Sequence, residues 1–383
     1  FERMATHIGA ARGDPMWNLL VSRNFIPAGR ILFGLGNPHH TSTLKNCLVG
    51  RTLVPTDSGI RRLDTLDGGC IRLDYASHKS TIPMPMGHRS VVRVETREGF
   101  EVVCTPDHRL RSASGEWIEA QNLKDGDLLD LAVDGRLLPA GSEDDFLDGY
   151  ITGLFLGDGT FCGEDFKVAN IRLFGEKRNL IESALLERFK LNPLFKDDHT
   201  AFNSTRLAKM LDSRFGIKHG VRCLTDALVS ASRNTLIGLV RGLFDTDGGV
   251  YISKSTYSRV ISIGQSDRTF LQRLQVILLT LGIKGVIYSN GDAGPKTFPG
   301  GIYECAAAWA LHITRDSFRV FVETIGFTHP SKVAKALVAM ERPFKAVSWT
   351  ARVLQVVPAG EEDVYDLGVE DVHAFGADGL VAG

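Results

Sequence analysis

Several features that would assign this chain to a special class of protein are absent from its sequence. No apolar run approaches the roughly 18–20 residues that a membrane-spanning helix needs, so we expect no membrane association. Residues 1–20 carry charges throughout and have no apolar centre, so we expect no secretory signal peptide. The 6 cysteines form neither a CxxC pair nor an even-spaced framework, which favours reduced thiols in a cytoplasmic protein.

An excess of charge of one sign is also absent. The net charge of the 383 residues is −1, which argues against a uniformly basic nucleic-acid binder. Basic residues nevertheless outnumber acidic ones between Phe166 and Arg222. Such a run is usually a solvated surface, although it can also contact phosphates. The length exceeds one ordinary domain and predicts two or three.

The periodicity of the apolar residues changes twice along the chain. Short alternating stretches such as residues 91–96 predict β-strands between Cys47 and about Gly141. From about Glu143 the period becomes helical, and strand patterns return after about Pro343, in residues 347–357 and 364–369. We therefore expect a β-rich domain interrupted by an α+β insertion, since a surface loop accepts an insertion at low cost.

A thiol, a Thr-x-x-His box and a late Asp/His pair occur in this order in the β-rich parts. These residues are Cys47, Thr105, Asp107, His108, Asp366 and His373. A thiol that attacks the preceding carbonyl converts an amide into a thioester, with an effective molarity of about 10⁵–10⁸ M. The leaving amine needs a proton, which suits His108, while Thr105 and Asp107 can polarise the scissile amide. Each residue alone is more often structural, so the hypothesis depends on their joint occurrence.

These segments resemble the splicing blocks of an intein of the Hedgehog/intein (HINT) fold. The matching stretches are residues 47–66, 99–108, 364–375 and 377–382. The resemblance implies that Cys47 makes an N–S acyl shift, which cleaves its bond to Asn46 after activation by the Thr-x-x-His box. Asp366 and His373 would couple this step to the later ones, in which the flanking extein segments are joined without a cofactor.

Two positions depart from the intein pattern. Inteins normally end in His-Asn followed by Cys, Ser or Thr, whereas Gly383 occupies the penultimate slot here and no Asn follows it. Asp378 stands where Asn is usual, although Asp tolerates the same turn geometry almost as well. We therefore do not expect this chain to complete splicing, and the missing His would slow cyclisation of the terminal Asn.

Residues 1–46 combine a helical pattern at residues 16–21 with a glycine-rich loop. Residues 25–36 and 43–46 resemble the N-terminal part of a cobalamin-dependent ribonucleotide reductase. In that family an Asn-Cys pair follows, so the intein would lie between Asn46 and a Cys beyond its own end. The stretch holds no catalytic set, and we expect no reductase activity from it.

Two apolar helical stretches end in acidic and glycine residues. Residues 151–156 lead into Asp158, and residues 240–244 lead into Asp247. One Asp-Gly pair after a helix is usually a cap, but its repetition predicts an internal duplication. The two stretches resemble the LAGLIDADG motif of homing endonucleases, which implies a pseudo-twofold α+β domain. Glycines in both helices, including Gly153, would let them approach closely and bring the two acids together.

Paired carboxylates at Asp158 and Asp247 can hold Mg²⁺ against a scissile phosphate. The LAGLIDADG resemblance implies cutting of double-stranded DNA at the intein-less allele. We expect DNA contacts from Lys167, Arg172, Lys177, Arg178 and Lys254. Three lysines are candidates to polarise the phosphate, and the sequence does not choose among Lys167, Lys254 and Lys284.

We therefore expect a multi-domain monomer. Its parts are an N-extein fragment at 1–46, a HINT splicing domain at 47–142 and 343–383, and an endonuclease at 143–342. A free-standing endonuclease with β-rich flanks would leave Cys47 unexplained. A Hedgehog-like autoprocessor using a small nucleophile fits the terminal strand and the insertion poorly. An inert scaffold or binding module is favoured if neither cleavage occurs.

Overall fold

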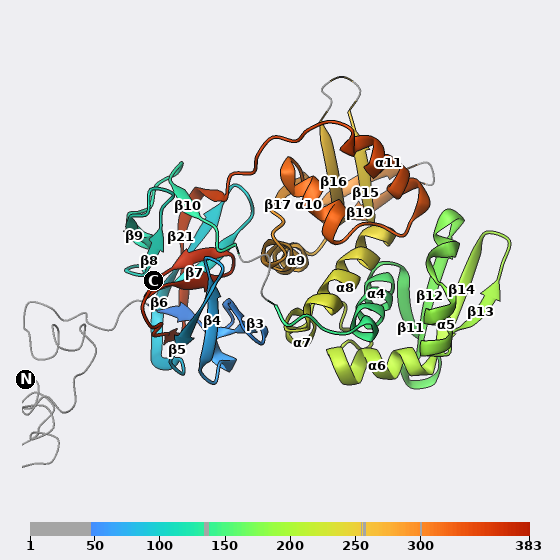
Figure 1. Ribbon diagram of the computed structural model, residues 1–383, viewed down its shortest axis with the longest axis horizontal. Coiled ribbons are helices and arrows are strands. Elements are labelled where there is room, and N and C mark those ends of the chain that lie inside the picture. Colours follow the sequence, from blue (N-terminus) through green and yellow to red (C-terminus); the bar gives the residue numbers. More distant parts are fainter. Residues whose placement is uncertain (1–46, 134–137, 254, 256–257, 299–300) are drawn as a thin grey trace, which may run out of the picture.

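The computed structural model describes residues 47–133, 138–253, 255, 258–298 and 301–383. The reductase-like stretch 1–46 with its expected helix, Asn46 and Lys254 lie outside these residues. The described part forms a β unit (residues 47–133 and 350–383) and an α/β unit (residues 138–340), which lie side by side (Figure 1). No helix in the described ranges is both long and apolar enough to span a membrane.

The β unit combines strands from the beginning and the end of the described chain. Its strands are β1 (Leu48–Val49), β2 (Leu53–Thr56), β3 (Gly59–Arg62), β4 (Gly69–Leu73), β5 (Ala76–Ser80), β6 (Met84–Thr96), β7 (Glu101–Cys104), β8 (Arg109–Arg111), β9 (Trp117–Glu119), β10 (Leu128–Asp130), β21 (Thr350–Asp366), β22 (Phe375–Ala377) and β23 (Leu380–Ala382). The 3-10 helices are η1 (Leu63–Thr65) and η2 (Ala120–Asn122). The sheet orders are β1-β7-β6-β21-β10, β3-β2-β4-β5 and β22-β23-β8-β9, so late strands pair with early ones.

Strand β21 is one strand of 17 residues, where two separate strands were expected from the sequence. It pairs with β6 along most of its length, with register shifts at Val353/Gln355, Pro358/Glu361 and Asp363/Tyr365. Such bulges absorb extra residues and bend the strand without ending the pairing. The polar stretch at 358–363, which interrupts the apolar alternation, therefore stays in the ladder.

The α/β unit contains two sheets that each follow a long helix. Its helices are α4 (Glu143–Asp158), α5 (Ser183–Phe189), α6 (Thr205–Phe215), α7 (Asp226–Val229), α8 (Arg233–Thr246), α9 (Arg268–Thr280), α10 (Asp316–Thr324) and α11 (Pro330–Met340), with η3 (Glu164–Phe166) and η4 (Gly175–Leu180). The first sheet consists of β11 (Gly159–Cys162), β12 (Val168–Phe174), β13 (Asn192–Phe195) and β14 (His199–Ser204). The second consists of β15 (Gly248–Ile252), β16 (Arg259–Gln265), β17 (Gly285–Gly291) and β20 (Ala308–Ile313), beside a hairpin of β18 (Gly294–Phe298) and β19 (Gly301–Cys305). Their orders are β11-β12-β14-β13 and β15-β16-β20-β17.

Helices α4 and α8 pack backbone against backbone. Ser142 forms a capping box that begins α4, and the Ser232 hydroxyl caps α8. A Cβ on Gly153 would lie 2.3 Å from the Leu239 carbonyl oxygen, and one on Gly242 would lie 2.3 Å from that of Tyr150. Only hydrogen fits at these positions, so the prediction that glycines allow the close approach is confirmed.

Helix α9 joins the two units. Its Leu279 is fully buried and belongs to the apolar core of the β unit, where a Cβ on Gly379 would touch it. The buried Gln275 amide donates to the carbonyl oxygens of Glu98 (2.8 Å) and Gly285 (2.9 Å). The backbone N–H of Ile287, on β17, also donates to Glu98 (2.9 Å). The turn between β6 and β7 therefore covers an edge strand of the α/β unit.

Candidate functional site

The amide that precedes Cys47 is held by Thr105. The buried Cys47 donates its backbone N–H to Thr105 Oγ1 at 3.1 Å, and the Thr105 backbone N–H donates to the Cys47 carbonyl at 2.9 Å. The hydroxyl therefore lies against the nitrogen of the bond that the sequence predicts to be cleaved. This hydrogen bond fixes the orientation of the amide and places a hydroxyl beside the nitrogen that must become the leaving amine.

His108 lies in the same turn as Thr105. Its backbone N–H donates to the Thr105 carbonyl at 2.9 Å, and its carbonyl accepts from Ala120 at 2.7 Å. His108 is 1% exposed, so its imidazole is shielded from bulk water. Asp107 is partly exposed between them, and its charge reaches the Cys47 thiol.

The Cys47 thiol is strongly protonated in this environment. Burial raises its pKa to about 12, with a further increase from the charges of Asp366 and Asp107 and an opposing decrease from Arg89. The register that pairs Leu48 with Tyr365 brings Asp366 beside Cys47. Sequence reasoning missed Arg89, because only the pairing of β6 with β21 reveals that it faces this site.

The end of β23 returns to the Thr-x-x-His turn. The Gly383 backbone N–H donates to the carbonyl of Arg109, the residue after His108, at 3.1 Å. His373 is exposed with a φ of +49°, and its carbonyl oxygen would lie 2.9 Å from a Cβ on Gly383. The described chain therefore brings Cys47, Thr105 and Gly383 to one end of the β unit.

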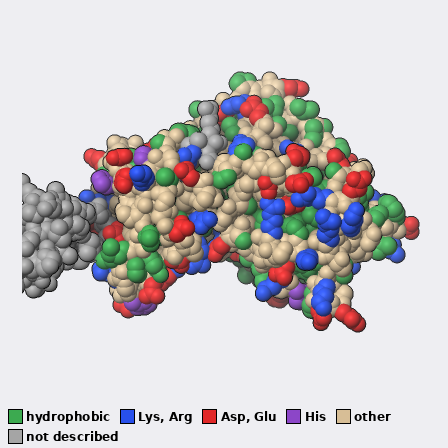
Figure 2. Space-filling view, turned by 60° about the horizontal axis from the view of Figure 1, so that its bottom comes forward, with side chains coloured by type: hydrophobic (Ala, Val, Ile, Leu, Met, Phe, Trp, Pro, Cys, Tyr) green, Lys and Arg blue, Asp and Glu red, His purple; other side chains and the backbone are tan. Residues whose placement is uncertain are grey.

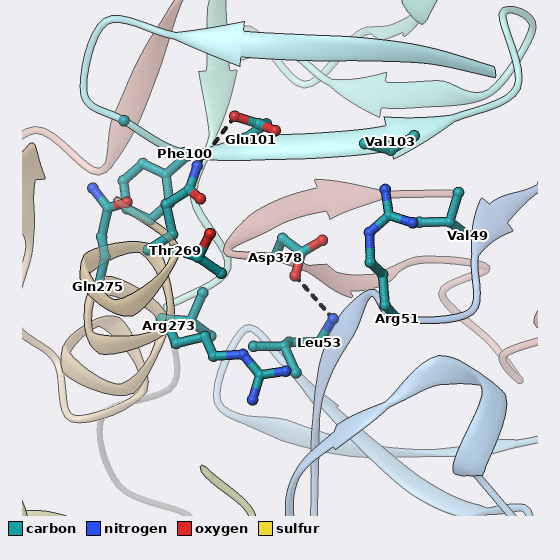
Figure 3. A pocket seen from close by; sticks show the side chains of 13 residues that line it. Val49, Arg51, Leu53, Phe100, Glu101, Val103, Thr269, Arg273, Gln275 and Asp378 are labelled. Carbon is teal, nitrogen blue, oxygen red and sulfur yellow. Dashed lines mark hydrogen bonds between the residues drawn. The ribbon is translucent and has the colours of Figure 1, made fainter. Parts of the chain in front are cut away.

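Asp378 is partly buried, in a turn between two buried residues, and has a φ of +48°. Its Oδ1 accepts from the Leu53 backbone N–H at 2.9 Å, and its own N–H donates to the Leu53 carbonyl at 2.9 Å. Burial raises the pKa of this carboxyl to about 7, and the Leu53 hydrogen bond, Arg51 and Arg273 oppose that effect. Figure 3 shows Asp378 between these two arginines, in a cavity of about 170 Å³ that the β unit shares with α9.

The cysteines form no disulfide, and all 6 lie in the described part of the chain. Leu48 on β1 pairs directly with Cys104 on β7, and both pack in the main core of the β unit. Cys47, one residue earlier, packs in a separate apolar cluster. Because neighbouring side chains alternate between the faces of a sheet, Cys47 and Cys104 point to opposite sides. A disulfide between them would need the strand to be rebuilt.

The two acids of the duplicated motif interact in the α/β unit. Asp158 ends α4, and Asp247 directly follows α8. Desolvation raises the pKa of Asp247 first, and the charge of Asp158 raises it further. Lys177 Nζ donates to Asp158 at 2.7 Å, and Gln265 Nε2 donates to Asp247 at 3.3 Å. The site thus combines two carboxylates with a cation and an amide.

Lys332 completes this cluster, although no sequence motif points to it. From α11, its ammonium donates to the carbonyls of Phe244 and Asp245 at the end of α8, each at 2.7 Å. Burial lowers its pKa to about 8, and nearby carboxylates including Asp247 partly oppose this decrease. Lys284 lies elsewhere, because its ammonium donates to the carbonyls of residues 348 and 350 in the segment that leads into β21.

Much of the basic stretch between Phe166 and Arg222 stabilises α4. Arg188 and Arg214 both form ion pairs with the buried Asp148. The Arg222 guanidinium donates to the carbonyls of residues 156 and 157 at the end of α4. Figure 2 shows basic and acidic side chains intermixed over the α/β unit. These three arginines therefore hold α4, and the other cations of the stretch have separate surroundings.

The other predicted DNA-contact residues have varied surroundings. Lys167 is exposed and pairs with Asp165 at 2.9 Å. Arg172 lies on the exposed side of β12, with its Nε donating to Asn170 at 3.1 Å. Arg178 donates to a backbone carbonyl at residue 197. Arg172 is the member of this set on an open sheet face, where a long ligand has access.

Comparisons with known proteins identify a family for part of the chain. Residues 234–326, from α8 to just beyond α10, match the LAGLIDADG-like domain family. The chain is 25% identical over 392 residues to the ribonucleoside-diphosphate reductase NrdEB subunit alpha of Bacillus subtilis (strain 168), covering 88% of this chain and 35% of that protein. It is 24% identical to the ribonucleoside-diphosphate reductase large subunit of Invertebrate iridescent virus 6, and the alignment covers 70% of this chain and 28% of that protein. The chain thus spans about a third of these relatives, and the similarity extends well beyond residues 1–46.

Solved structures with some similarity come from two groups. A crystal structure of I-DmoI in complex with DNA and Ca aligns with 50% of this chain and 97% of its own, at 16% identity and a TM-score of 0.33. A crystal structure of a G-1F mutant of the Ssp DnaB mini-intein variant M86 aligns with 88% of this chain and 96% of its own chain, at 10% identity and a TM-score of 0.29. The family match confirms the predicted LAGLIDADG domain and the prediction of an enzyme. The LAGLIDADG match lies inside the segment where the sequence predicts an inserted endonuclease, and the similarity to reductase subunits agrees with the predicted host protein.

Proposed function

We propose that the β unit cleaves its own bond between Asn46 and Cys47 by an N–S acyl shift, the first step of protein splicing. The observation that carries this proposal is the 3.1 Å hydrogen bond between the Cys47 amide nitrogen and the Thr105 hydroxyl. It connects the Thr-x-x-His turn to the nitrogen that must become the leaving amine.

The reaction proceeds within one site. The Cys47 sulfur attacks the Asn46 carbonyl carbon, the bond from that carbon to the Cys47 nitrogen breaks, and a thioester replaces the amide. The thiol proton is transferred to the nitrogen, which leaves as an amine. His108 carries out this transfer as general acid, while burial, aided by the charges of Asp366 and Asp107, keeps the thiol protonated until the step begins. His373 and Asp366 then serve the later steps.

Intact-mass analysis tests this step. The chain is incubated with and without dithiothreitol, beside a Cys47→Ala variant and a matched Cys70→Ala control in β4. Thiol-dependent release of a fragment ending at Asn46 from wild type and control, but not from Cys47→Ala, is the expected result. Release from the Cys47→Ala variant would remove the thiol from the mechanism.

We also propose that the α/β unit is a metal-dependent endonuclease for double-stranded DNA. The interacting pair of Asp158 and Asp247 supports this activity. Oxygen ligands suit Mg²⁺, which is commonly bound by one or two carboxylates together with substrate phosphates and water. The described residues contain no cluster of three or more His, Cys, Asp or Glu, so phosphate and water would supply the other ligands.

When bound, Mg²⁺ polarises the phosphate and activates water. The chain's own residues orient the reaction. Lys177 holds Asp158 in place, and Gln265 holds Asp247. Lys332, with its pKa near 8, can exchange a proton near neutral pH and neutralise charge on the phosphate. Arg172, Lys177 and the other predicted cations would contact the duplex.

Separate acid variants test the endonuclease. Asp158→Asn or Asp247→Asn should abolish cutting of a duplex target and leave DNA binding largely intact. Asp212→Asn is the matched control, because Asp212 is exposed on α6, and this variant should cut normally. Cutting that survives either change would locate the metal elsewhere.

The two activities imply one architecture. We propose a single splicing domain, built from residues 47–142 and 343–383, that the endonuclease at 143–342 interrupts. The shared sheets of early and late strands support this division. The host would be a ribonucleoside reductase, the DNA target its intein-less gene, and the active species a monomer.

A further inference from the structure

A groove of about 490 Å³ lies at the junction of the two units, and we call it the junction groove. Four cations line it. Arg97 and Arg352 belong to the β unit, Lys284 directly precedes β17, and Arg315 lies at the N-terminus of α10. Among its described lining residues, Glu98 is the only acid, and its carboxylate already accepts from the Arg352 backbone N–H at 2.7 Å. The lining of the groove therefore carries four cations and one acid.

The groove adjoins the open face of the second sheet. Strand β15 begins directly after Asp247, and β17 is the opposite edge of the order β15-β16-β20-β17. Ile287 is buried on the side of α9, so Tyr288, which is half-exposed, points to the open face. Three strand spacings of about 4.8 Å separate the acid pair from the groove, which corresponds to roughly four base pairs of 3.4 Å. One duplex on this face can reach both places.

Arg315 adopts a backbone conformation that is unfavourable for a residue with a side chain. Its φ and ψ are +55° and −147°, a region that glycine normally occupies. It is exposed, and among the described residues no hydrogen bond or ion pair of its guanidinium is found. Lys284 is half-buried beside it; burial lowers the pKa of Lys284, the charge of Glu98 opposes this decrease, and the charge of Arg315 adds a smaller decrease. A bound anion would offset the repulsion between the two cations.

The arginines of the β unit are available to a ligand. Arg97 pairs with Asp125 at 2.8 Å, but both side chains are more than half exposed, at 52% and 61%, so the pair is weak. Arg352 is exposed, and one of its nitrogens donates to the Gly126 carbonyl at 3.0 Å. Phosphate oxygens can therefore replace or add to these contacts.

We propose that the junction groove binds backbone phosphates of duplex DNA that flanks the cleavage site, so that the splicing unit is part of the DNA-binding surface. This proposal rests on the proposed endonuclease function and adds a second contact region to it. The groove contributes affinity that does not depend on base sequence, because phosphate contacts carry no direct sequence information.

The test measures binding of a labelled 40-base-pair duplex by fluorescence anisotropy across salt concentrations, with EDTA present to prevent cutting. The Arg97→Gln/Arg352→Gln double variant should reduce the steepness of log affinity against log salt by about 2. Between 50 and 200 mM salt, its loss of affinity should therefore be about 12-fold smaller than that of wild type. Lys79→Gln, an exposed lysine on β5, is the control and should match wild type. An unchanged slope in the double variant would overturn the proposal.

Arg315→Gly gives an independent readout. The slope should fall by about 1, while the thermal midpoint rises because glycine accepts this backbone conformation. A higher midpoint with an unchanged slope would mean that Arg315 does not contact DNA. If wild type binds the duplex and cuts its target while all groove variants bind normally, only this proposal fails. If wild type does not bind the duplex, the endonuclease proposal fails as well.

Discussion

Replacement of Asp378 by Asn should stabilise the protein, and the gain should grow with pH. Burial raises the pKa of this carboxyl from its ordinary 3.8 to about 7 in the folded state. A raised folded pKa means that the contribution of the group to stability is complete below pH 3.8 and is lost as pH rises through 7. A difference of about three in pKa corresponds to about 4 kcal/mol, at about 1.4 kcal/mol per pKa unit.

Asparagine preserves the other features of the turn. Its amide oxygen can accept from the Leu53 N–H as the carboxylate does. Asn also tolerates the left-handed backbone, here with a φ of +48°. The variant therefore removes the buried charge and leaves both the hydrogen bond and the conformation in place.

Urea unfolding of wild type and Asp378→Asn near pH 4 and pH 8 measures the effect. We expect the advantage of the variant in unfolding free energy to be larger at pH 8 by about 2–4 kcal/mol. Asp371→Asn is the matched control, because Asp371 also has a positive φ, of +66°, but is exposed. An advantage that is the same at both pH values, within about 0.5 kcal/mol, would refute the assignment of a buried ionised carboxylate.

Three further experiments address the remaining sites. Asp366→Asn should speed thiol-induced cleavage after Asn46 at a fixed pH and thiol concentration, because the charge of Asp366 raises the pKa of the Cys47 thiol; an unchanged rate would contradict the charge interaction. Gly242→Ala should lower the unfolding free energy by about 2–3 kcal/mol, since the new Cβ would lie 2.3 Å from a carbonyl oxygen. Gly264→Ala is the control, because a Cβ there has space. An equal loss in both variants would exclude the helix contact as the cause. Lys332→Met should slow DNA cutting more than tenfold and flatten the pH dependence of the cutting rate near pH 8. Lys335→Met, on the exposed side of α11, is the control and should cut normally. Equal rates in the two variants would remove Lys332 from the site.

Local patterns predicted the elements that local forces determine. The apolar period predicts helical stretches at 151–156 and 240–244, which lie within α4 and α8. Residue spacing also identified Thr105, because the turn that carries it is short.

Residues that depend on long-range register could not be found in this way. Arg89 faces Cys47 only through the pairing of β6 with β21, and Lys332 reaches the acid pair only because α11 packs beside β15. Charge counting likewise carries no information on long-range contacts. It cannot tell that Arg188 and Arg214 are engaged by Asp148, whose burial follows from the packing of α4.

The position of Leu279 has an evolutionary consequence. This side chain from α9 fills part of the core that surrounds Phe100 and Gly379 in the β unit. Excision of the inserted segment would leave a cavity there, at a cost of about 2–5 kcal/mol if the loss resembles that of a buried leucine side chain. Substitution of Asp158 would silence the inserted segment and leave that core untouched. Gradual decay by point substitution is thus an easier route than deletion, and an inactive insert would be retained as a structural part of its host.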